Sequence, residues 1–100
     1  MSISTHQKEQ IINHFNLLTE QFIKNKQEKR KIKILFQEQE KEGQSYYEAG
    51  KYYSCFWDKE FVSEEFLGEV VTHEFTHIYF LINQGYHEHD EKFFSYFETF

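Results

Sequence analysis

The fold is decided by residues 63–85, which read SEEFLGEVVTHEFTHIYFLINQG. Ser63 is a favourable N-cap, two glutamates follow in the first turn, and Gly85 is a usual left-handed stop. One helix is therefore predicted from Ser63 to about Asn83. Its apolar side chains spread around most of the helix circumference, and they are Phe66, Val70, Phe75, Ile78, Leu81 and Ile82. A helix with so many apolar directions is expected at the centre of the fold.

Within this helix, His73-Glu74-Phe75-Thr76-His77 has the spacing H-E-x-x-H. Residues four apart lie on one helical face, so His73 and His77 can present two imidazole nitrogens to one zinc ion. A carboxylate beside a zinc-polarised water can take its proton and later deliver it to a leaving amine. The motif therefore predicts a zinc site with Glu74 as general base.

A third ligand must come from elsewhere, and the nearest candidates follow the helix stop in Gly85-Tyr86-His87-Glu88-His89-Asp90. His87 and His89 are both within reach across a turn. Carboxylates could also bind zinc, although acids at the start of a helix more often cap it. These carboxylates belong to Glu88, Asp90, Glu91 and Glu98.

The chain before the motif helix predicts one more helix and a small sheet. Apolar residues at helical spacing, from Ile11 to Phe22, indicate a covering helix over Thr5–Lys26. Alternation over Ile32–Gln37 indicates a strand, and further strands are expected over Ser45–Ala49 and Tyr52–Trp57. A turn at Gly50 between the last two strands favours an antiparallel hairpin.

A final helix is predicted over Asp90–Phe100, with Phe93, Phe97 and Phe100 on one face. The expected class is α+β, with an N-terminal helix, a small antiparallel sheet of about three strands, a central metal-binding helix and a C-terminal helix. One hundred residues suffice for a single domain, residues 1–100. The lone Cys55 excludes an internal disulfide and is expected in a strand or the core.

Charge is divided unevenly along the chain. Residues 1–33 carry seven Lys/Arg and three acids, whereas residues 34–100 carry four Lys and 14 acids. The basic run between Lys24 and Lys33 is the one candidate for nucleic-acid contact, but a solvated helix end explains it better. Neither a leader segment nor a membrane-spanning run is found, so a cytoplasmic location is expected.

The motif and its continuation resemble the SprT-like and WLM metallopeptidase families, which are small zincins. In those families a turn and then a histidine follow the motif helix, with a phenylalanine four residues later, as in His89-Asp90-Glu91-Lys92-Phe93. The resemblance implies His73, His77 and His89 as zinc ligands and Glu74 as general base. It also implies a polypeptide substrate that binds as an added strand beside Tyr52–Trp57.

Two other functions are compatible with these residues. One is a zinc-stabilised binding or inhibitor module without catalysis, in which the metal only joins two helices. The other is a metal-dependent endoribonuclease, because the Gly-Tyr and histidines after the motif helix resemble the YbeY-like family. That family has Gly where this chain has Glu74, so the carboxylate favours the peptidase.

Overall fold

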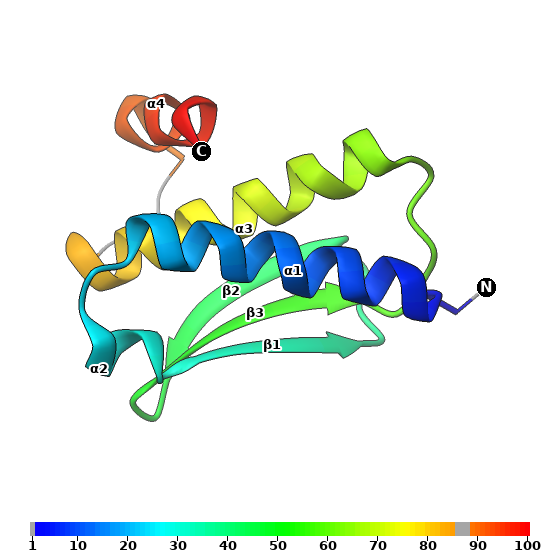
Figure 1. Ribbon diagram of the computed structural model, residues 1–100, viewed down its shortest axis with the longest axis horizontal. Helices are drawn as coiled ribbons and strands as arrows, with labels where there is room; N and C mark the ends of the chain where they lie inside the picture. Colours follow the sequence, from blue (N-terminus) through cyan, green and yellow to red (C-terminus); the bar gives the residue numbers. More distant parts are fainter. Residues whose placement is uncertain (1, 86–88) are drawn as a thin grey trace.

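The computed structural model describes residues 2–85 and 89–100, and Figure 1 shows its helices and strands. In chain order they are α1 (Thr5–Phe22), α2 (Lys26–Lys29), β1 (Ile32–Gln37), β2 (Gly43–Glu48), β3 (Lys51–Trp57), α3 (Glu64–Asn83) and α4 (Glu91–Thr99). The expected α+β class and the order of its main elements are confirmed. None of the helices described is both long and apolar enough to cross a membrane.

The sheet has the strand order β1-β3-β2 and is mixed. β2 and β3 form the expected antiparallel hairpin, whose turn places Ala49 and Gly50 at positive φ. β1, however, pairs with β3 in parallel, so the expectation of an entirely antiparallel sheet is wrong for this pair. The chain reverses direction from β1 to β2 and again from β2 to β3, so β3 runs parallel to β1 once it lies between the other two strands. Burial explains that order. β3 is the most buried strand and takes the centre, whereas β2 is exposed at Gln44, Tyr47 and Glu48 and takes an edge.

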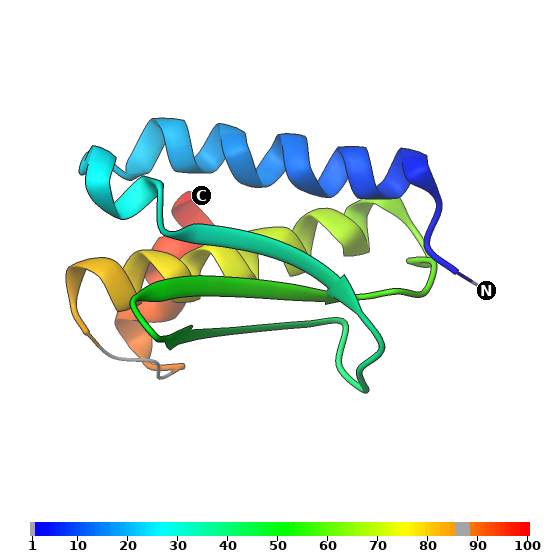
Figure 2. The ribbon, with the colours of Figure 1, turned by 90° about the horizontal axis from the view of Figure 1, so that it is seen from below.

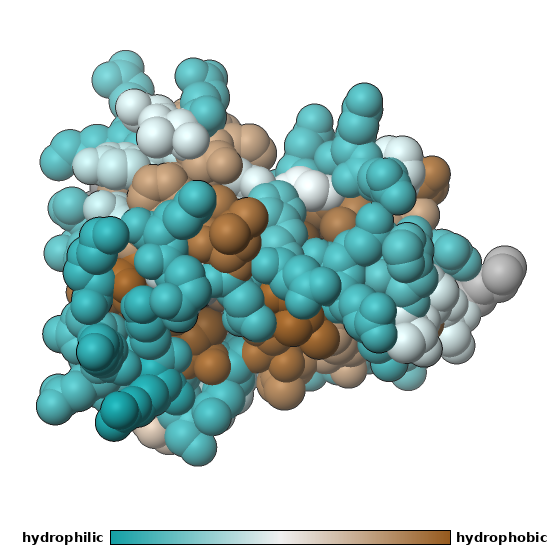
Figure 3. Space-filling model, viewed as in Figure 1, coloured by the Kyte–Doolittle hydropathy of each residue, from teal (hydrophilic) through white to brown (hydrophobic). Residues whose placement is uncertain are grey.

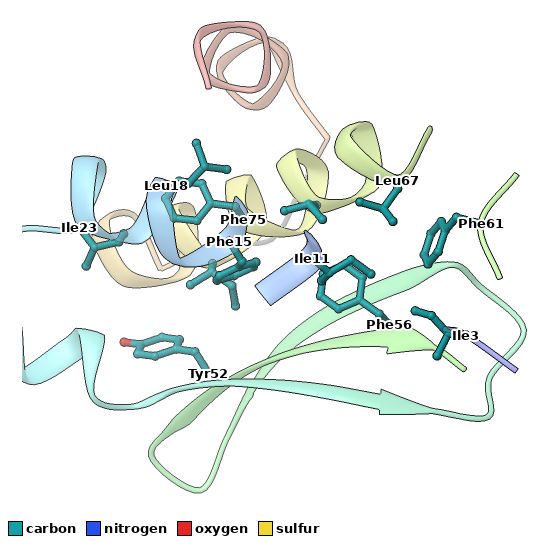
Figure 4. Close-up of a cluster of buried hydrophobic side chains, with 12 residues drawn as sticks. Ile3, Ile11, Phe15, Leu18, Ile23, Tyr52, Phe56, Phe61, Leu67 and Phe75 are labelled. Carbon is teal, nitrogen blue, oxygen red and sulfur yellow. The ribbon is translucent and has the colours of Figure 1, made fainter. Parts of the chain in front are cut away.

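Both long helices cover the same face of the sheet (Figures 1 and 2). Figure 4 shows how their apolar side chains meet those of the central strand. Phe15 of α1 and Phe75 of α3 contact edge to face, with ring centroids 5.6 Å apart. Phe56 contributes from β3, and all three rings are fully buried. The core therefore lies between the two helices and the sheet, and it fixes α3 at the centre of the molecule.

The ends of α3 follow the sequence signals. The Ser63 hydroxyl accepts a hydrogen bond from the backbone N–H of Phe66 at 3.1 Å. At the other end Gly85 has a φ of 73°, and its N–H donates to the carbonyl of Phe80 at 2.8 Å. The predicted helix from Ser63 to Asn83 is confirmed, so the H-E-x-x-H motif occupies its interior.

The first helix is shorter than predicted. α1 ends at Phe22 because Ile23 adopts an extended backbone conformation. Asn25 then caps a separate short helix, α2, since its side chain accepts hydrogen bonds from the N–H groups of Gln27 and Glu28. An asparagine stabilises a new helix start better than it continues an existing helix.

Exposed apolar side chains do not form one continuous surface on the face shown in Figure 3, where hydrophobic patches are separated by hydrophilic residues. Such scattered exposure is ordinary for a protein of this size.

Candidate metal centre

Three histidine side chains converge at the junction of α3 and α4. His73 and His77 lie one turn apart on α3, and their Nε2 atoms are 3.2 Å from each other. His89 precedes α4 and brings its own Nε2 atom to 3.2 Å from that of His73 and 2.9 Å from that of His77. The fold thus assembles the three predicted ligands, and together they could hold a metal ion.

The dimensions of this triangle suit zinc. Zinc binds histidine nitrogens at about 2.0–2.1 Å in tetrahedral sites, which separates two ligating nitrogens by about 3.3 Å. The three measured separations, 2.9–3.2 Å, are close to that value. A neutral imidazole nitrogen carries either a proton or a lone pair, so the three contacts among these nitrogens cannot all be hydrogen bonds at once. A shared cation can bind all three nitrogens together.

The ring of Phe93 supports the three imidazoles from α4. This ring is fully buried, and its centroid lies 5.1 Å from that of His73, 4.6 Å from that of His77 and 4.8 Å from that of His89. Phe93 is the residue four positions after His89 that the family resemblance singled out. Its packing restricts ring rotation, which helps to preorganise the ligand nitrogens.

Glu74 points away from solvent and towards the sheet. Its side chain is almost fully buried, and its Oε1 atom accepts a hydrogen bond of 2.7 Å from the Ser45 hydroxyl. Its Oε2 atom lies 4.0 Å from Nε2 of His73. Burial raises the pKa of Glu74 from its ordinary value of 4.5 to about 7, against the lowering effects of Ser45 and the Lys41 charge. A bound dication would favour the carboxylate again.

Gly43 allows β2 to approach Glu74 closely. A Cβ atom at position 43 would lie 2.7 Å from Cγ of Glu74 and 2.8 Å from its Oε2. The expected strand begins only at Ser45, so the sequence signals leave Gly43 outside it and connect neither residue with the site. A glycine at a strand position often marks close approach by another group, and this signal could have indicated the contact.

A cleft of about 310 Å³ opens onto His73 and Glu74. Its walls come from α3, from α4 and from the segment that leads into β2. The other lining residues are Lys41, Glu42, Gly43, Phe66, Glu69, Val70 and Phe97. Lys41 is the one cation among the lining residues in the described part of the chain. The candidate base and one candidate ligand therefore border the same cleft.

The prediction that a substrate pairs with the strand Tyr52–Trp57 is wrong. Tyr52–Trp57 belongs to β3, which is paired with β1 along one side and β2 along the other. A strand bonded on both sides has no free ladder for a peptide. The edge strands are β1 and β2, and β2 is the one that borders the cleft, through Gly43.

The remaining candidate residues lie outside the cluster or outside the described residues. His87 and Glu88 fall in the undescribed range 86–88. Asp90 caps α4, since its Oδ1 atom accepts a hydrogen bond of 2.9 Å from the N–H of Phe93. Glu91 and Glu98 are exposed, and Cys55 is buried in β3 as expected.

Comparisons with family models, with curated proteins and with solved structures found no match to this chain. The resemblance noted in the sequence therefore receives no support from them.

Zinc should bind at one ion per chain, with His73, His77 and His89 as protein ligands. Removing one ligand by alanine substitution should weaken binding by more than about 100-fold, the upper range for loss of a residue that merely orients a ligand. Calorimetric titration with zinc measures the affinity of the wild type and of each variant. His6→Ala and His87→Ala serve as controls and should have far smaller effects. A loss for His87→Ala equal to that for His89→Ala would contradict the assignment.

The buried Glu74 carboxyl should make the metal-free protein less stable as pH rises. The folded state keeps a proton up to about pH 7 that the unfolded chain releases near pH 4.5, so stability falls through this window. Glu74→Gln removes the effect. Relative to this variant, the wild type should lose about 3 kcal/mol in urea unfolding between about pH 4 and about pH 8. If the difference in unfolding free energy between the wild type and Glu74→Gln does not change with pH, the prediction is wrong.

Proposed function

We propose that this protein is a zinc-dependent peptidase. The observation that carries the proposal is the convergence of three histidine nitrogens beside the carboxylate of Glu74, whose Oε2 lies 4.0 Å from Nε2 of His73. His73 and Glu74 border one cleft. This combination provides a cation site and a base within reach of the same small molecule or peptide group, as hydrolysis requires.

His73, His77 and His89 would hold the ion. When bound, zinc would polarise a water molecule and the substrate carbonyl, which makes hydrolysis feasible at neutral pH. Glu74 would accept the proton of the attacking water and return it to the leaving amine. Lys41 lines the same cleft, and its positive charge would stabilise negative charge on the carbonyl oxygen.

A catalytic zinc site needs a position free of protein ligands. Among the described residues, the group able to hold a metal ion contains three histidines. Three protein ligands suit a catalytic site, whereas a closed structural site would need a fourth. Glu74 also favours catalysis, because a purely structural site has no use for a buried carboxylate beside its ligands.

An extended polypeptide is the proposed substrate. β2 is an edge strand, and its first residue, Gly43, lies in the wall of the cleft. A peptide that pairs with this edge would pass beside Glu74 and obtain affinity from backbone hydrogen bonds. The acids Glu42 and Glu69 in the cleft disfavour a nucleic-acid phosphate backbone there, which weakens the endoribonuclease alternative.

Glu74→Gln should abolish peptide cleavage and leave zinc binding intact. Loss of a general base costs about 10²- to 10⁴-fold in rate. The zinc-loaded wild type and variant should be incubated with unfolded protein substrates, with and without single-stranded DNA, and the cleavage products quantified by mass spectrometry. Glu65→Gln is a matched control, because Glu65 is an exposed glutamate on the same helix.

Two outcomes would oppose the proposal. Cleavage that persists undiminished in Glu74→Gln would assign the activity to another group or to a contaminant. No cleavage by the zinc-loaded wild type, together with a fourth protein ligand on the metal, would instead favour the zinc-stabilised binding or inhibitor module.

A further inference from the structure

Two serines from neighbouring strands lie directly beneath Glu74. Ser45 of β2 and Ser54 of β3 are partners in the antiparallel register, and their hydroxyl oxygens are 2.9 Å apart. Ser45 is 5% exposed and Ser54 is fully buried. The Ser45 oxygen also lies 2.7 Å from Oε1 of Glu74. The three side chains form one buried chain of polar contacts that runs from the central strand to the candidate base.

The number of protons fixes the direction of this chain. Each serine hydroxyl has one proton to donate, and an ionised carboxylate can only accept. When Glu74 is ionised, Ser45 therefore donates to Oε1, and Ser54 must donate to Ser45. Hydrogen bonds arranged in such a sequence strengthen one another. Oε1 of Glu74 is therefore hydrogen-bonded to the sheet through Ser45.

The opposite oxygen of Glu74 is left for the cleft. Oε2 lies within 4.0 Å of Nε2 of His73 and has no hydrogen bond comparable to that of Oε1 among the described residues. Gly43 provides the space for this arrangement, because a Cβ atom there would come within 2.9 Å of three Glu74 atoms. The edge strand thus limits where the carboxylate can lie.

We propose that Ser45, supported by Ser54, is a positioning residue that holds Glu74 so that Oε2 is the atom accepting a proton from a ligand at the metal. This inference rests on the proposed function, because it assumes an ion on the three histidines and a ligand in its open position. The opposing view is that the serines only compensate the burial of a carboxylate. In that case their loss would lower stability without changing what Glu74 does at the metal.

Acetohydroxamate separates these views without the need for a substrate. A hydroxamic acid binds zinc through two oxygens and gives up a proton, for which Oε2 of Glu74 is the proposed acceptor. Its affinity for the zinc-loaded protein should be measured by calorimetry in wild type, Ser45→Ala, Ser54→Ala and Glu74→Gln. Thr19→Val is the control, because it removes a buried hydroxyl that donates to the Phe15 carbonyl in α1, away from the cluster.

Ser45→Ala should bind acetohydroxamate about 10-fold more weakly and Ser54→Ala about 3-fold more weakly, since Ser45→Ala loses both hydrogen bonds of the chain and Ser54→Ala loses one. Zinc affinity should be unchanged in both variants, and Thr19→Val should match the wild type. In peptide cleavage, Ser45→Ala should lower kcat with little change in KM.

If both serine variants bind acetohydroxamate as tightly as the wild type and Glu74→Gln binds it more weakly, the positioning role is wrong. The proposed function is then unaffected. Failure of the zinc-loaded wild type to bind acetohydroxamate would instead overturn the proposed function, and the inference with it. If Ser45→Ala does not fold, Ser54→Ala decides alone. A threefold loss supports the inference, and unchanged affinity refutes it.

Discussion

The burial of Glu74 between α3 and the edge of the sheet is the constraint on which the site depends. A carboxylate with 3% exposure is costly unless polar groups surround it. β2 provides the Ser45 hydroxyl, which donates a hydrogen bond of 2.7 Å to Oε1 of Glu74. It also provides Gly43, at a position where the Cβ atom of any other residue would collide with Glu74. These two features require β2 to lie against the helix at the position of the motif. The edge strand and the motif helix therefore form one unit.

Neighbouring residues of α3 point their side chains in two different directions. Glu74 faces the sheet, whereas His73 and His77 face α4 and His89. α3 can contact both the sheet and α4 with polar side chains because its apolar residues pack against α1 and the core on its other sides. α4 packs mainly against α3, and Phe93 places its buried ring against all three histidines. A metal ion at this junction would link α3 to the start of α4 through the histidine side chains.

Sequence reasoning succeeded where the signals are local. The cap at Ser63, the stop at Gly85 and the H-E-x-x-H spacing depend on residues a few positions apart, and the structure confirms α3 and the histidine cluster. It failed where the outcome depends on pairing between distant segments. Strand alternation cannot tell that β3 lies between β1 and β2, and no short-range pattern connects Ser45 or Ser54 with Glu74. The end of α1 was misplaced because the cap at Asn25 was overlooked.

The central claim is that three histidines leave one position of the metal open beside Glu74. X-ray absorption spectroscopy on the zinc-loaded protein tests it most directly, since it reports the number and type of atoms bound to the ion. The structure leads us to expect three imidazole nitrogens at about 2.0–2.1 Å and an oxygen from water. That oxygen should be replaced when acetohydroxamate is added. Four protein ligands, with no change on adding the hydroxamate, would contradict the account.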